Sequence, residues 1–141
     1  MTGETAATTY SIPESFEAAL KLIRAALARA GLSVIGELDI SGRIQRSLGI
    51  GMAQCKVLYV CSKQSILEAI NVCPAVGIFL PLHIVVSARG EQTEIHLLAS
   101  LLADNDNPSP AVATPLNRFR DEISRAIEKV AMRRSFCQLS P

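Results

Sequence analysis

The stretch CKVLYVCSKQSILEAINVCPAVGIFLPLHIVV, residues 55–86, decides the fold. It opens with Val, Leu and Tyr residues in an order typical of a β-strand from Lys56 to Cys61. Apolar residues then recur at helical spacing and predict a helix from Lys63 to Asn71, which Pro74 ends. The apolar run from Pro81 to Ala88 predicts a further strand. The stretch therefore encodes a strand, a helix and a strand in succession.

On the N-terminal side of this stretch, the pattern predicts two more strands with a helix between them. The strands span Thr8 to Ile12 and Leu32 to Ile40. The helix carries an apolar stripe that begins at Phe16 and ends at Ala30, with Gly31 where a helix C-cap belongs. Residues 41–49 are predicted to form a polar connection, with a helical turn as an alternative.

On the C-terminal side, Arg89-Gly90 is predicted to be a two-residue turn that joins Pro81–Ala88 to a partner strand at Thr93–Ala99. Residues 104–115, rich in Asn, Asp and Pro, are predicted to form a loop. A last helix is expected to follow Thr114-Pro115. The basic pair Arg133-Arg134 is interpreted as a helix-end feature.

The order of these elements predicts an α+β fold, because helices and strands do not strictly alternate and one hairpin is present. We expect a twisted, mainly antiparallel sheet with helices packed on one face. The whole chain, residues 1–141, is expected to form a single domain, with flexible tails at residues 1–9 and 135–141.

Composition narrows the class of function. Apolar residues make up 49% of the chain and charged residues 19%, with a net charge of +1. A nucleic-acid binder usually carries a strong basic excess, so no nucleic-acid partner is expected. The longest apolar run, residues 76–86, is too short to span a bilayer, and the N-terminus does not resemble a signal peptide. We therefore expect a cytoplasmic protein without a membrane partner, whose cysteines are free thiols.

Two histidines form the first candidate site. A turn at Arg89-Gly90 would place His83 and His96 directly opposite each other on neighbouring strands. Two adjacent imidazoles can share a transition metal, which would be the only cofactor that the sequence indicates. The alternative is a pair of ordinary surface or interface histidines. The face opposite these histidines, with Ile84 and Ile95, is predicted to be core.

Cys61 is the second candidate, as a reactive thiol. It ends a predicted strand just before a helix, and a helix N-terminus favours the thiolate form. The alternative is a small buried apolar residue. The acidic pair Glu37 and Asp39 could perform acid–base chemistry, although a solvated strand face explains it better. Arg43 and Arg46 could bind an anion, but two arginines in a polar loop are ordinary.

Several short segments together resemble the family called domain of unknown function 302, over about residues 10–100. The segments that carry this resemblance are Gly31-Leu32, Glu37-Leu38-Asp39, Leu48-Gly49, Tyr59-Val60-Cys61 and Val76-Gly77-Ile78-Phe79-Leu80-Pro81. The resemblance implies a β-α-β(4)-α-like arrangement, here with an extra short helix, and small proteins that are often dimeric. It implies no established activity. Ser62-Lys63 and Leu82 depart from the family pattern, which often has Asn-Pro and Cys at these places.

These observations favour a non-enzymatic module that self-associates, as a homodimer or other homo-oligomer, and binds a small ligand or a protein partner. The low charge and the half-polar sheet face are the reasons. The alternative is a thiol- or metal-handling protein that uses Cys61 or the His83/His96 pair. A hydrolase ranks last, because the sequence contains no nucleophile and base at a recognisable spacing.

Overall fold

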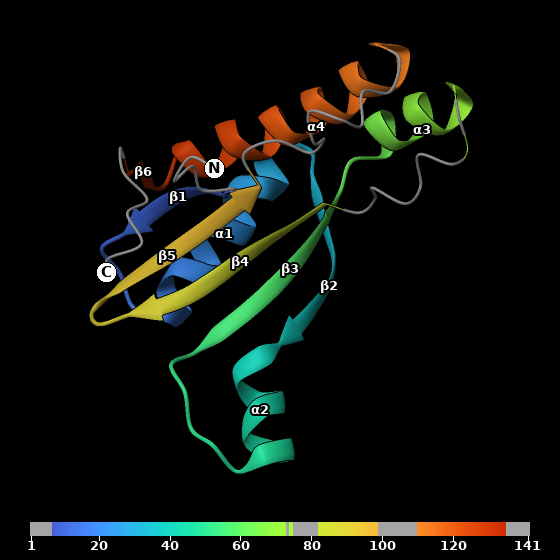
Figure 1. Ribbon diagram of the computed structural model, residues 1–141. Helices are drawn as coiled ribbons and strands as arrows, with labels where there is room; N and C mark the ends of the chain where they lie inside the picture. The colour runs from blue at the N-terminus through green and yellow to red at the C-terminus, as the bar shows by residue number, and fades with distance from the viewer. Residues whose placement is uncertain (1–6, 73, 75–81, 99–109, 135–141) are drawn as a thin grey trace, which may run out of the picture.

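The computed structural model describes residues 7–72, 74, 82–98 and 110–134 (Figure 1). It confirms the predicted α+β class. Its elements in chain order are β1 (Ala7–Ile12), α1 (Phe16–Arg29), β2 (Ser33–Asp39), α2 (Ile40–Leu48), β3 (Cys55–Cys61), α3 (Lys63–Val72), β4 (Leu82–Arg89), β5 (Gln92–Leu98), α4 (Pro110–Glu128) and β6 (Met132–Arg133).

The sheet has six strands in the order β2-β3-β4-β5-β1-β6, and every pair of neighbours is antiparallel. Helices α1 and α4 pack against each other and against one face of the sheet (Figure 1). Alternate side chains of β4 and β5 point into this layer, since successive residues of a strand face opposite sides. We call the other side of the sheet, which carries His83 and His96, the open face.

The core lies between the sheet and these two helices. The hairpin face that was predicted to be core is confirmed, since Ile84, Val86 and Ile95 are fully buried. Helices α1 and α4 each carry apolar residues at helical spacing, and this apolar side of each helix packs against the sheet. The largest fully buried side chains are Tyr10, Ile12, Ile23, Leu27, Leu58, Ile84, Ile95, Leu97, Leu116, Phe119, Ile123 and Ile127.

Local sequence signals explain the best-predicted helix, α1. The hydroxyl oxygen of Ser15 accepts a hydrogen bond from the amide of Ala18 at 3.3 Å and so caps the first turn. At the other end Gly31 has a φ of +79°, a left-handed conformation that glycine adopts without strain. The chain can therefore reverse into β2 immediately after the helix.

Helix α2 replaces the turn that was expected between β2 and β3. The carboxylate of Asp39 accepts hydrogen bonds at 2.9 Å from the amide of Gly42 and from the hydroxyl of Ser41. At the other end Gly49 has a φ of +68° and ends the helix. With both ends capped, the short segment forms a helix despite its polar composition.

Helix α4 begins earlier than predicted, at Pro110 rather than after Pro115. Residues 110–115 are therefore helical, and the prediction of a loop there is wrong; residues 104–109 lie outside the described residues. Pro115 lies inside the helix. Pro110 stands at the first helical position, where a proline is favoured, whereas Pro115 removes one backbone hydrogen bond from the second turn, a cost that the rest of the helix tolerates.

The C-terminal segment also differs from the prediction. Helix α4 ends at Glu128, and Arg133 lies in β6, where it pairs with Tyr10 of β1. The interpretation of Arg133-Arg134 as a helix-end feature is therefore wrong. At the other terminus residues 7–9, assigned to a flexible tail, form the start of β1. The remaining tail residues lie outside the described part of the chain.

Candidate functional site

The register of the β4–β5 hairpin places the two histidines differently from the prediction. Arg89 pairs with Gln92, so the turn is Gly90-Glu91, one residue later than predicted. Gly90 has a φ of +62°, and a two-residue hairpin turn of type II′ favours a glycine at its first position. His96 consequently lies opposite Val85 instead of His83. Direct pairing of the histidines is therefore wrong.

Both histidines nevertheless lie on the open face. The new turn changes the register by two residues, and a change of two keeps every side chain on its own face of the sheet. His83 is exposed, and its ring centroid lies 6.1 Å from that of Tyr59 at an interplanar angle of 52°. His96 is half-buried, and in the register it is a diagonal neighbour of His83.

His96 is held by side chains from three strands. Its Nδ1 lies 3.1 Å from the Thr9 hydroxyl of β1, and its Nε2 lies 3.4 Å from the Ser87 hydroxyl of β4. Glu94 of β5 approaches the same Nε2, with Oε1 at 3.6 Å. Burial lowers the pKa of His96 below its usual value of 6.5, and Arg89 contributes, while the Glu94 carboxylate opposes the shift. The imidazole is therefore neutral at pH 7.

Glu94 is a buried carboxylate with cationic partners. Its Oε2 accepts a hydrogen bond from Arg134 Nη1 at 2.5 Å, and its Oε1 lies 3.8 Å from Arg89 Nη1. A buried charge is tolerated only when it is paired in this way. Arg134 follows β6, so the ion pair fastens the end of the described chain across β1 to β5.

Thr9, His96 and Glu94 place a hydroxyl, an imidazole and a carboxylate in sequence, an order that also occurs in nucleophilic catalysis. Sequence analysis missed this series because its members come from two strands distant in the chain. Thr9 is only 3% exposed, so a substrate carbonyl cannot reach its hydroxyl. Two arginines also hold the carboxylate. The series therefore serves to orient His96 within the sheet.

The arrangement of the two imidazoles does not favour a metal ion shared by His83 and His96. Ser87 and Glu94, which engage Nε2 of His96, lie on the turn side of His96, whereas His83 lies on its other side. Within residues 7–72, 74, 82–98 and 110–134, no group of three or more His, Cys, Asp or Glu side chains is arranged to hold a metal ion. Metal binding by the pair stays a prediction.

A cavity of about 180 Å³ opens beside the histidines. It lies among strands β1, β4 and β5, and is lined by Ala7, His83, Val85, His96, Leu97 and Leu98. Apolar atoms make up most of its wall. The register explains the cavity, because Ala7 and Val85 present small side chains on the open face between larger neighbours.

The cysteines occupy different settings. Cys61 ends β3 opposite Ser33, is half-buried, and precedes α3 as predicted. Its role as a reactive thiol stays a prediction. Burial raises the pKa of the Cys55 thiol, and the nearby Asp39 carboxylate adds to the effect, so Cys55 is protonated at neutral pH. Cys73 and Cys137 lie outside the described residues, as does the family segment at residues 76–81.

The acidic pair on β2 has structural partners. Glu37 bonds to Arg24 of α1 and lies 3.2 Å from Nζ of Lys56, and the hydrogen bond from Arg24 is the main reason that its pKa is lowered. The pKa of Asp39 is lowered mainly by the hydrogen bond from the Gly42 amide. Both carboxylates are therefore ionised and engaged, which does not suit a proton-transfer pair.

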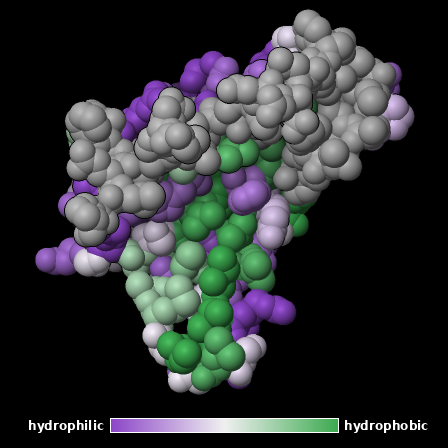
Figure 2. All heavy atoms as spheres, viewed as in Figure 1, coloured by the Kyte–Doolittle hydropathy of each residue, from purple (hydrophilic) through white to green (hydrophobic). Residues whose placement is uncertain are grey.

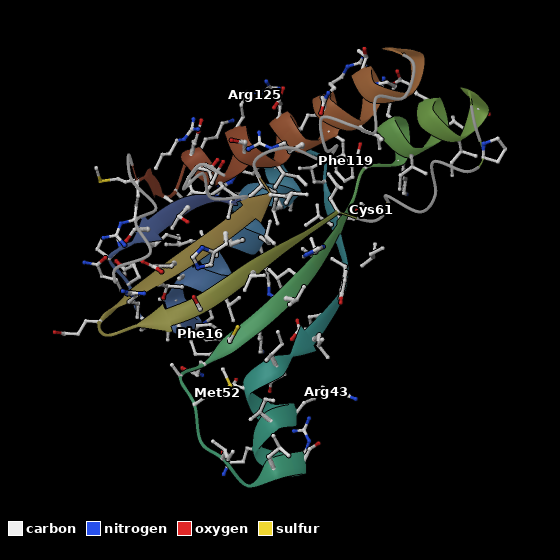
Figure 3. All side chains as sticks on the ribbon, in the orientation of Figure 1. Phe16, Arg43, Met52, Cys61, Phe119 and Arg125 are labelled. Atoms are coloured by element: carbon white, nitrogen blue, oxygen red, sulfur yellow. The ribbon has the colours of Figure 1, made fainter. Side chains whose placement is uncertain are left out.

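The second surface of interest is the segment of residues 40–54, which contains α2 and the loop after it, and which we call the projection. It extends beyond the helix-covered part of the sheet, and Arg43 and Met52 lie on it (Figures 1 and 3). None of the residues of α2 is buried. Leu48, Ile50 and Met52 are 64%, 56% and 46% exposed.

Hydrophobic side chains gather on the projection and on the strand beside it (Figure 2). Ile35 of the neighbouring β2 is 57% exposed. Sequence analysis missed this surface. The signal was available, since Ile40, Ile44 and Leu48 are spaced four residues apart and would form one stripe on a helix. Arg43 and Arg46 are exposed on α2, and anion binding by this pair stays a prediction.

The described helices include none with the length and apolar character needed to cross a membrane.

Comparison with known proteins identifies the family. No curated protein matches the chain. Among solved structures, the chain is similar to the crystal structure of an uncharacterised conserved DUF302 protein from Bacillus stearothermophilus, with a TM-score of 0.79 and 18% identity. The match covers 90% of this chain and 99% of that chain, and at this identity it shows the fold alone. The sequence pattern of the domain of unknown function DUF302 matches residues 8–130, so the chain belongs to that family.

Proposed function

We propose that the protein is a non-enzymatic binding module that self-associates through the projection and the adjoining edge of β2. The observation that carries this proposal is the exposure of Leu48, Ile50 and Met52 on the projection, while Ile35 is a further exposed apolar side chain on the edge strand β2. Large apolar side chains that gather on one side of a protein usually mark an interaction surface. Burying such a side chain contributes about 1.5–3 kcal/mol, so the cluster can drive association.

The partner that suits this surface best is a second copy of the chain. Strand β2 lies at one edge of the sheet and pairs only with β3, so its other edge is free among the described strands. A free edge offers backbone donors and acceptors to another strand. Two copies related by a two-fold axis can pair their β2 edges antiparallel, which continues the sheet across the interface.

Charge also supports a second copy. The surface carries both signs, with the guanidinium groups of Arg43 and Arg46 on α2 and the carboxylate of Glu37 on β2, which also pairs with Arg24 and Lys56 within the chain. A two-fold interface brings a patch against its own copy, so a patch with both signs can be complementary to itself. A single-sign patch would instead favour an oppositely charged partner.

Sedimentation velocity over a wide concentration range tests the proposal. The wild-type chain should form a dimer or a higher oligomer, and Leu48→Glu and Ile50→Glu should shift it to the monomer. Met132→Glu is the matched control, because Met132 is 76% exposed at the opposite end of the sheet. A monomeric wild type at high concentration would refute the proposal, as would an equal response of the control.

A further inference from the structure

We propose that the cavity beside His83 and His96 is a binding site for a small organic molecule, about the size of one aromatic ring, that carries a single hydroxyl or carboxylate group. This site lies on β1, β4 and β5, away from the projection. It is independent of the proposed self-association.

The volume and the wall of the cavity set the size of the ligand. An apolar cavity of about 150 Å³ takes a benzene molecule, and the cavity here measures about 180 Å³. Ala7, Val85 and Leu98 supply aliphatic contacts. A wall that is mostly apolar with few polar groups is the usual composition of a small-molecule site. The ligand body is therefore apolar.

His96 supplies a fixed planar wall. Hydrogen bonds to Thr9 and Ser87 occupy its two nitrogens and hold the ring in place. A site whose lining side chains are fixed by neighbours loses little entropy when it binds a ligand. Since the polar atoms of His96 are already engaged, the ring is left to contact the ligand through its carbon atoms, which suits an apolar or aromatic molecule.

His83 supplies the polar contact. It lines the same cavity but is exposed. Its ring contacts the ring of Tyr59, and this contact leaves the ring nitrogens of His83 available to a ligand. An imidazole can donate or accept a hydrogen bond, so it can meet a hydroxyl or a carboxylate. This arrangement places the apolar body of the ligand inside the cavity and its polar group at the mouth.

Nuclear magnetic resonance titration of the full-length protein tests the site, with phenol, benzoate and toluene as probes. Phenol or benzoate should shift the amide signals of Val85, His96 and Leu98 saturably, with a dissociation constant in roughly the millimolar range. His83→Leu should weaken phenol binding by between about two-fold and ten-fold, the effect of one hydrogen bond, and leave toluene binding unchanged.

Val85→Phe, which fills the cavity, should abolish the response to every probe. Glu91→Phe is the control, because it adds the same ring at the exposed hairpin turn outside the cavity. If Val85→Phe does not fold, the His83→Leu comparison of phenol with toluene decides. Absence of saturable shifts, or equal shifts in the cavity-filled and control variants, would overturn the proposal. A wild-type protein that binds the probes but stays monomeric would overturn only the proposed function.

Discussion

The two ends of this sheet use the same apolar patterning with opposite results. At the β1–β5 end, the stripes of α1 and α4 are buried against the strands, and residues such as Ile23 and Phe119 are fully enclosed. At the β2 end, α2 presents a stripe of the same spacing, yet none of its residues is buried. The difference lies in the partner layer, because α1 and α4 pack on the sheet and on each other.

Pattern alone therefore does not say whether an apolar face is satisfied within the chain. An amphipathic helix gains most of its stability from packing its apolar face, so a helix such as α2 depends on its caps and on a partner. The contrast between the enclosed end and the projection gives four predictions.

The largest effect should come from the enclosed end. Phe119→Ala removes a ring that is fully buried between α4 and the sheet, and it should reduce the free energy of unfolding by about 3–5 kcal/mol. Leu48→Ala at the projection should change it by at most about 0.5 kcal/mol in dilute, monomeric protein. Urea denaturation monitored by circular dichroism measures both. Similar losses in the two variants would show that the projection is packed within the chain.

The ion pair at Glu94 should give the next largest effect. Arg134→Gln removes the closest cationic partner of a buried carboxylate, and it should cost about 1–2 kcal/mol of unfolding free energy. Arg133→Gln is the matched control, because Arg133 is the adjacent arginine and is exposed on β6. Urea denaturation of the two variants measures the difference. Equal stabilities would mean that Arg134 does not fasten the C-terminal segment to β5.

Much of the fold was predictable because its signals are local. The stripe of α1 and the glycine after it predicted that helix correctly, and alternation predicted the buried face of the β4–β5 hairpin. Errors arose where two local signals compete. Arg89-Gly90 and Gly90-Glu91 are both plausible two-residue turns. The second is the one that forms, and it places Gly90 at the first turn position.

The candidate site was less predictable because it depends on contacts between distant strands. Thr9 and His96 are 87 residues apart in sequence, and no pattern within either strand indicates that they meet. The cavity likewise needs the register of β1 on β5, which the sequence did not specify. The projection is a different case, since its apolar spacing was present in the sequence but the segment was interpreted as a polar connection.

The cap of α2 should control the projection without affecting the enclosed end. Asp39→Ala removes the carboxylate that accepts hydrogen bonds from Gly42 and Ser41, so amide hydrogen exchange in α2 should become several-fold faster. Asp39→Asn keeps a side-chain oxygen that can cap the helix and should retain most of the protection. Exchange in α1 and α4 should not change in either variant. Faster exchange throughout the protein would contradict the separation of the two ends.

The smallest effect should be the pH dependence that His96 gives to the enclosed end. Burial lowers the pKa of His96 in the folded protein below 6.5, whereas in the unfolded chain it returns to its usual value. Between the folded pKa and 6.5 the unfolded chain binds more protons, so acidification favours unfolding. The contribution of His96 to stability is therefore fully present above pH 6.5 and decreases as the pH falls toward the folded pKa. Unfolding free energies measured at intervals from pH 7.5 to 5.5 should show this decrease.

His96→Asn should flatten the pH dependence, because asparagine does not titrate. His83→Asn is the control, since it removes an exposed imidazole from the same face of the sheet. The window above pH 5.5 stays clear of the carboxylates of Glu37 and Asp39, whose pKa values are lowered below 4.5 and 3.8. If His83→Asn flattens the pH profile and His96→Asn does not, then Thr9 and Ser87 do not hold the imidazole of His96 in its neutral form. His96 would then not be the fixed wall that the proposed binding site requires.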